Sequence, residues 1–168
     1  MKDHHKHMKD DHKHKNYVSD IIHCIAKLQQ SKKDPHCMGM VINNSGSSKN
    51  TVPFMLYTNN GVPFEATGVY IADPDGKQPK FKTVSTFLFR VNKIDNERAV
   101  LELLAFKNDW PRPTAVPTSV PTSVRTSALG PGFQIENENV NDLVRTGVYV
   151  NVDLTNFTAV TTLPVVSL

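Results

Sequence analysis

Alternating apolar and polar residues, punctuated by turn residues, constrain the fold of this chain more than any other feature. The clearest example has Val148, Val150, Val152 and Leu154 alternating with Tyr149, Asn151 and Asp153. A period of two places one set of side chains on a buried face of a strand and the other set in water. We therefore predict one strand here and a last strand over residues 157–163.

Two more pairs of strand-like segments flank turn signals. Segments 51–58 and 62–67 enclose Asn-Asn-Gly at 59–61, which tolerates positive φ angles, so we predict a tight hairpin. Segments 81–94 and 99–106 enclose a polar stretch, and we predict a second, central hairpin. The sequence AVLELLAF at 99–106 also suits a helix, but its length and its strongly β partner favour a strand.

The N-terminal part has a different period. Apolar residues spaced by three and four predict an amphipathic helix of about three turns, and they are Val18, Ile21, Ile22, Ile25 and Leu28. Pro35 cannot lie in a helix interior, so the helical segment is confined to residues 16–34.

These patterns predict a mainly β protein, namely an antiparallel β-sandwich or barrel-like domain with one short N-terminal helix. Residues 1–15 have no apolar face, and we expect a disordered tail. Residues 35–168 form a single β domain in this interpretation. A loop rich in Pro, Thr and Ser interrupts it at 110–131, where Pro recurs every four residues and denies both helix and ladder.

The N-terminal tail holds five of the seven histidines, namely His4, His5, His7, His12 and His14. It also holds five Lys and three Asp, which supply +2 of the net charge of +3. The nearly neutral body argues against a nucleic-acid partner. Imidazoles of a flexible tail chelate metals weakly because each ligand must first be ordered. We therefore predict no metal site, with these five histidines as the only candidates, and no cofactor.

Catalytic chemistry finds little support in the sequence. No histidine follows His36 and no cysteine follows Cys37, so a triad would need a histidine of the N-terminal segment. His23 neighbours Cys24, but adjacent helical residues point about 100° apart. Paired carboxylates could still support glycoside hydrolysis, but the sequence does not show which of them converge, and most surface carboxylates are only solvated. The candidates are Glu65, Glu97, Glu102, Glu136, Glu138, Asp142 and Asp153. We predict that the protein is not an enzyme and has no catalytic residues.

Two cysteines, Cys24 and Cys37, are too few for a disulfide framework. Idle or buried thiols are the favoured interpretation, while an intramolecular or an intermolecular disulfide stays open. No run of about 18 apolar residues predicts a membrane span, and the polar N-terminus lacks the apolar region of a secretory signal. We expect a chain made in the cytosol without a signal peptide and without a membrane partner.

Several short blocks together resemble the spore coat protein Y/Z family, which includes exosporium protein Y of spore-forming bacilli. They are PFMLYT at 53–58, GVPFEA at 61–66, FRV at 89–91 with AVL at 99–101, and VDL at 152–154 with FTAV at 157–160. The likeness spans residues 17–168 apart from the Pro/Thr/Ser loop.

The resemblance implies a structural, self-assembling protein of the spore surface (outer coat, crust or exosporium), made in the mother-cell cytosol. It implies two kinds of partner, other copies of the chain in an oligomer or two-dimensional lattice and other spore-surface proteins. Where the family carries further cysteines, this chain has other residues, namely Asp95, Glu97, Arg98, Tyr149, Asn156, Thr158 and Thr162. Any lattice must therefore rest on packing and strand edges, with sparse links from Cys24 or Cys37.

An alternative function is a β-sandwich binding module for a glycan or another surface protein. Such a module should present a concave patch lined by aromatic side chains. Trp110, the one tryptophan, lies beside the Pro/Thr/Ser loop and outside the predicted strands.

Overall fold

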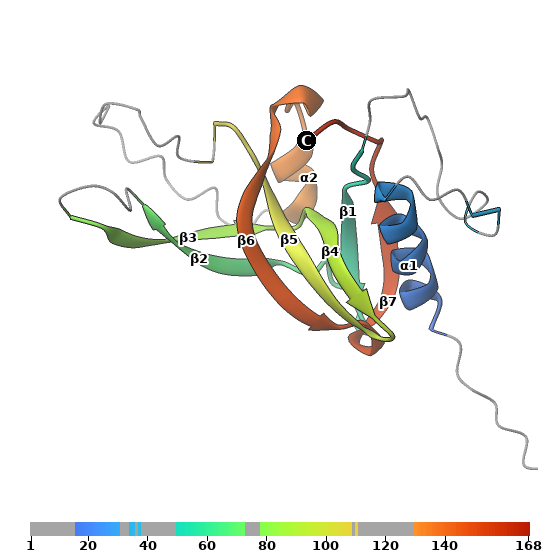
Figure 1. The fold of residues 1–168 in the computed structure, drawn as a ribbon. Coiled ribbons are helices and arrows are strands. Elements are labelled where there is room, and N and C mark those ends of the chain that lie inside the picture. Colours follow the sequence, from blue (N-terminus) through green and yellow to red (C-terminus); the bar gives the residue numbers. More distant parts are fainter. Residues whose placement is uncertain are drawn as a thin grey trace, which may run out of the picture.

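Figure 1 presents the fold as a computed structural model. The structure describes residues 16–30, 34–35, 37, 50–72, 78–108, 110 and 130–168. The predicted tail at 1–15, with its five histidines, lies outside the described residues, as do His36 and most of the predicted loop at 110–131. The predicted loop runs two residues too far, because Gly130 already begins a short helix. Pro131 suits the first turn of that helix.

The fold is mainly β with two antiparallel sheets, as the sequence predicts, and one helix of seven or more residues lies near the N-terminus. The described elements are α1 (Tyr17–Gln29), β1 (Phe54–Thr58), β2 (Ala66–Ala72), β3 (Lys80–Thr86), β4 (Phe89–Asp95), β5 (Arg98–Phe106), α2 (Gly130–Ile135), η2 (Val140–Asp142), β6 (Leu143–Asp153), η3 (Leu154–Asn156) and β7 (Phe157–Thr162). A five-stranded sheet has the order β6-β5-β4-β1-β7, and β2 and β3 form a two-stranded sheet.

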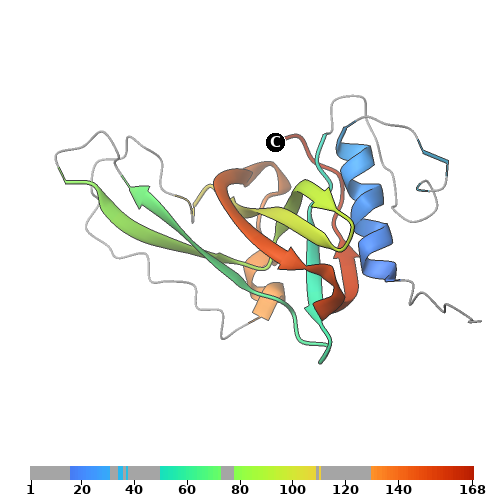
Figure 2. The same cartoon turned by 60° about the horizontal axis from the view of Figure 1, so that its bottom comes forward.

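Helix α1 begins at a defined cap. The side chain of Asn16 accepts hydrogen bonds from the N–H groups of Val18 and Ser19, at 3.1 and 3.3 Å. The predicted apolar stripe faces the sheet. Ile22 and Ile25 are fully covered where α1 packs against β4 and β7, while Ile21 and Leu28 are partly buried. The helix thus closes one side of the five-stranded sheet, as Figures 1 and 2 show.

The central hairpin is confirmed over residues 89–95 and 98–106. β4 and β5 pair from Phe89↔Leu103 to Asp95↔Arg98, and Asn96 adopts a φ of 52° in the turn. Residues 99–106 are a strand rather than a helix. β5 is buried on both faces over most of its length, with Leu101 and Leu103 in the larger apolar cluster and Leu104 and Phe106 in the smaller one.

The prediction of one long strand at 81–94 is wrong, because two strands of different sheets, β3 and β4, occupy it. At the break between β3 and β4, side chains accept the hydrogen bonds that a neighbouring strand would otherwise accept. The N–H of Leu88 donates to Thr86 Oγ1 at 3.0 Å, and the N–H of Phe87 donates to Gln134 Oε1 at 3.0 Å. The chain can therefore leave one sheet and enter the other without losing backbone hydrogen bonds.

The predicted hairpin of segments 51–58 and 62–67 is correct only at its turn. Gly61 has a φ of 73°, and the two segments meet in a single bridge between Tyr57 and Pro63. Pro63 has no N–H to extend the ladder, so the chain moves on to β2. β1 pairs instead with β4 and with β7.

Candidate functional site

Strands β2 and β3 form an arm that projects away from the five-stranded sheet, on the side opposite α1 (Figures 1 and 2). The two strands pair without a register shift from Ala66↔Thr86 to Ala72↔Lys80. β-branched and aromatic residues such as Val69, Tyr70 and Phe81 favour this extended ribbon. An isolated two-stranded ribbon is only marginally stable in water, so the arm depends on what it packs against.

The arm is attached to the main sheet by a close crossing at Gly68. A Cβ atom on this glycine would lie 2.2 Å from Val148 Cγ1 and 3.2 Å from Leu103 Cδ2. Only a residue without a side chain lets the backbone of β2 approach β5 and β6 so closely. The position of Val148 therefore decides how the arm is seated.

A bulge in β6 fixes that position. Glu102 pairs with Tyr149 and Leu104 pairs with Arg145, so three residues of β6 stand opposite one residue of β5. Gly147, at the middle of the bulge, has a φ of 70°, which favours glycine. Within the bulge, Thr146 Oγ1 donates a hydrogen bond to the carbonyl of Leu103 at 2.7 Å. The same oxygen accepts a hydrogen bond from the N–H of Val148 at 3.0 Å.

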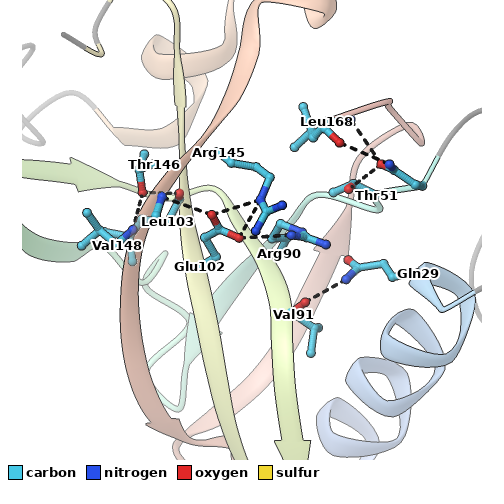
Figure 3. A network of polar contacts seen from close by, with 12 residues as sticks. Gln29, Thr51, Arg90, Val91, Glu102, Leu103, Arg145, Thr146, Val148 and Leu168 are labelled. Atoms are coloured by element: carbon cyan, nitrogen blue, oxygen red, sulfur yellow. Dashed lines mark hydrogen bonds and ion pairs between the residues drawn. The ribbon is translucent and has the colours of Figure 1, made fainter. Parts of the chain in front are cut away.

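The buried carboxylate of Glu102 holds the bulge in place (Figure 3). It accepts hydrogen bonds from Arg90 Nη1 at 3.1 Å, Arg145 Nε at 3.0 Å and the N–H of Gly147 at 3.1 Å. The side chain of Glu102 is only 1% exposed, so its charge needs these partners. The network thus links the interior of the main sheet to the seat of the arm.

An aromatic pair supports the inner face of the arm. The rings of Tyr70 and Trp110 have centroids 4.5 Å apart. Burial raises the pKa of the Tyr70 hydroxyl above its ordinary value, because the phenolate would lose hydration there. Trp110 therefore packs under the arm, rather than on a concave surface that could stack a sugar.

The outer face of the arm is apolar and open to solvent. Val69 is 60% exposed, Ile71 50% and Phe81 81%, and Ile71 lies directly opposite Phe81 in the register. Nearer the main sheet, the hydroxyl groups of Thr67 and Ser85 form a hydrogen bond of 2.7 Å. We call the surface formed by Val69, Ile71 and Phe81 the arm face. It is the candidate site for contacts with other proteins, since an exposed apolar patch commonly marks an interface.

The predicted cysteine candidates are brought together. Cys24 and Cys37 form an intramolecular disulfide with Cα atoms 5.2 Å apart, where the sequence had favoured idle thiols. Both cysteines are buried. His23 points elsewhere, with Nε2 3.1 Å from the carbonyl oxygen of Asn96. The Cys–His neighbours therefore do not form a nucleophile and base.

Three of the candidate carboxylates have separate partners. Glu102 belongs to the arginine network, Asp142 forms an ion pair with Lys107, and Asp153 accepts hydrogen bonds from Thr155. The pKa of Asp153 is lowered, first by the Thr155 side chain and backbone and then by the charge of Arg98. Within the described residues, no three His, Cys, Asp or Glu side chains form a group that could hold a metal ion.

A shallow groove of about 440 Å³ lies between the ends of β4, β5 and β6. Its charged lining mixes both signs, with Lys93 and Arg98 beside Asp95 and Asp153, and none of its lining side chains is aromatic. The groove thus lacks the stacking platform expected of a glycan-binding module.

Sequence reasoning missed the arm face. The predicted segments ended at residue 67 and began at residue 81, and so divided the arm between a hairpin and a central strand. The alternation of Val69 and Ile71 with Gly68 and Tyr70 was a signal for β2. That signal could not tell which of the two faces would stay uncovered.

A model of a known protein family matches most of the chain. The family model for spore coat protein Z matches residues 4–165, nearly the whole chain. No curated protein and no solved structure matches the chain. Among the described residues, no helix has both the length and the apolar character needed to cross a membrane. The chain therefore belongs to the spore coat protein Z family, which assigns it a structural role in the coat at the spore surface.

Proposed function

We propose that the protein is a self-assembling subunit of the spore coat, without catalytic activity, and that the arm face makes its contacts. The observation that supports this most is the exposure of Val69, Ile71 and Phe81 on a projecting ribbon. Other copies of the chain and other coat proteins are the partners we propose for this face. Its location in the outer coat, crust or exosporium layer belongs to the same proposal.

The size of the arm face predicts a weak single contact. Full burial of one large apolar side chain stabilises by about 1.5–3 kcal/mol, so burying these three partly exposed ones contributes roughly 4 kcal/mol per copy. Association costs about 4–15 kcal/mol in lost freedom of motion. Two arm faces together contribute roughly 8 kcal/mol, which lies within the range of that cost. Assembly should therefore require high concentration or several contacts per subunit, as in a lattice.

Non-covalent contacts should dominate. Cys24 and Cys37, the two cysteines of the chain, are bonded to each other and leave no thiol for a link between copies. We therefore expect assemblies that persist in a reductant and in a metal chelator.

Sedimentation velocity over a concentration series tests the proposal, with Phe81→Ser as the perturbing variant. The control is Tyr17→Ser, which removes another exposed aromatic ring, 70% exposed, from α1 on the opposite side of the molecule. We expect large species for the wild type and the control, and a marked loss of them for Phe81→Ser. A wild type that stays monomeric at every concentration would refute the proposed function.

A further inference from the structure

The open edge of β2 differs from the other strand edges in the described fold. β2 pairs with β3 along one edge, and the groups of its other edge point outward. Its sequence, ATGVYIA, contains no charge and no Pro, and its pairing shows no bulge. Natural proteins usually block such an edge with one of these features.

The neighbouring edges are blocked in these ways. β3 carries Lys80 and Lys82. β6 carries the bulge at Gly147 together with Arg145 and Asp153. β7 has only six residues and is contacted by α1. β2 is thus the described edge strand best suited to pair with another chain.

We propose that β2 pairs antiparallel with β2 of a second copy, around a two-fold axis at Val69. This inference rests on the proposed self-assembly and names its first contact. The seven residues of β2 overlap fully when Val69 lies opposite itself, and Thr67 then lies opposite Ile71 of the other copy. A contact of this kind uses the same surface on both copies, as two-fold dimers do.

The pairing extends the apolar face instead of hiding it. Residues an even number of positions apart lie on one side of a strand, so the two arm faces join on one side of a four-stranded sheet ordered β3-β2-β2-β3. The marginal two-stranded ribbon gains two strands. The joined face is then available for the next layer of contacts.

Charge selects β2 over β3. Pairing of two β3 strands around Phe81 would place Lys80 opposite Lys82 of the other copy, and the fully overlapping pairing around Thr83 would make the two Lys82 residues diagonal neighbours. Like charges at such close cross-strand positions are destabilising. In the β2 pairing the two β3 strands are separated by three strand spacings, roughly 14 Å. That separation exceeds the screening length of about 8–10 Å at physiological salt, so the lysines of the two copies interact little.

Two variants, each with one added cysteine at directly opposite positions of the arm, test the pairing. Val69 and Thr83 are partners in the β2–β3 register, and both are exposed on the outer face. In the proposed dimer the two copies of residue 69 are about 5 Å apart, whereas the two copies of residue 83 are roughly 14 Å apart. The full-length Val69→Cys and Thr83→Cys proteins are treated, under assembling conditions, with a bismaleimide whose span lies between these distances. The cross-linked dimer is measured on a denaturing gel, while sedimentation velocity reports assembly.

We expect Val69→Cys to give at least about tenfold more cross-linked dimer than Thr83→Cys when the two variants are compared at protein concentrations that give equal assembly by sedimentation velocity. That ratio corresponds to about 1.4 kcal/mol. Equal yields, or a higher yield at residue 83, in proteins that still assemble would overturn the β2 pairing and leave the proposed function standing. If the wild type and the two variants all stay monomeric, the β2 pairing and the proposed function are both overturned.

Discussion

Replacing Gly68 by Ala tests how the arm is attached to the main sheet. The new Cβ would lie 2.2 Å from Val148 Cγ1, closer than real Cβ contacts, so Val148 or β2 must move. Overpacking of this kind costs about 1–3 kcal/mol. The lower entropy of the unfolded Ala chain offsets about 0.4–1 kcal/mol. We therefore expect a net loss of about 1–2 kcal/mol in the free energy of unfolding.

A double-mutant cycle makes the test specific. Val148→Ala removes the clashing methyl and alone should cost about 2 kcal/mol in lost burial. The double variant should cost about the same as Val148→Ala alone, which gives an interaction energy of about 1–2 kcal/mol. Urea unfolding followed by circular dichroism measures all four proteins.

Gly132→Ala is the matched control. Its added Cβ meets no atom within 4 Å, so the entropy effect acts alone and the free energy of unfolding should rise by about 0.4–1 kcal/mol. Additive costs of Gly68→Ala and Val148→Ala, within about 0.5 kcal/mol, would refute the close crossing as the seat of the arm.

Three further outcomes are expected. Glu102→Ala should lower the free energy of unfolding in urea by about 3–5 kcal/mol, because Arg90 loses its buried partner. Asp142→Ala, in an exposed ion pair, should cost at most about 1 kcal/mol, and equal costs of the two variants would contradict the network. Replacing both cysteines by Ser should cost about 3 kcal/mol, since the bond closes a loop with a sequence separation of 13, and an unchanged unfolding midpoint would contradict this. The lowered pKa of Asp153 means that its contribution is present above the unfolded value of 3.8 and is lost as the pH falls through the folded pKa. Thr155→Val should raise the Asp153 pKa in a carboxyl NMR titration, and an unmoved pKa would count against the hydrogen bond as its cause.

Local patterns predicted the elements whose signal lies within one segment of the sequence. The stripe of α1, the turn between β4 and β5, and the alternation of β6 all appear in the fold as expected. Each of them depends on spacing within one segment, which the sequence displays directly.

The break between β3 and β4 depends on a distant residue. The alternating pattern continues through it, and Gln134, 47 positions from Phe87, supplies one of the bonds that replace the ladder. The same holds for the candidate site. In the sequence, Gly68 looks like an ordinary glycine of a strand. In the structure, the bulge at Gly147 brings Val148 so close to Gly68 that a side chain cannot fit there.

In the proposed function, a buried charge supports a contact surface. Glu102 and its arginines lie within the main sheet, yet they shape the bulge on which β2 rests. A change at Glu102 should therefore weaken assembly as well as folding, although the residue is buried.

Electron microscopy of the purified full-length chain beside Phe81→Ser tests the central claim most directly. The account predicts ordered sheets or other extended assemblies for the wild type, unchanged by reductant, and dispersed small particles for the variant under the same conditions. Extended assemblies of equal order in both proteins would contradict the arm face as the assembly surface.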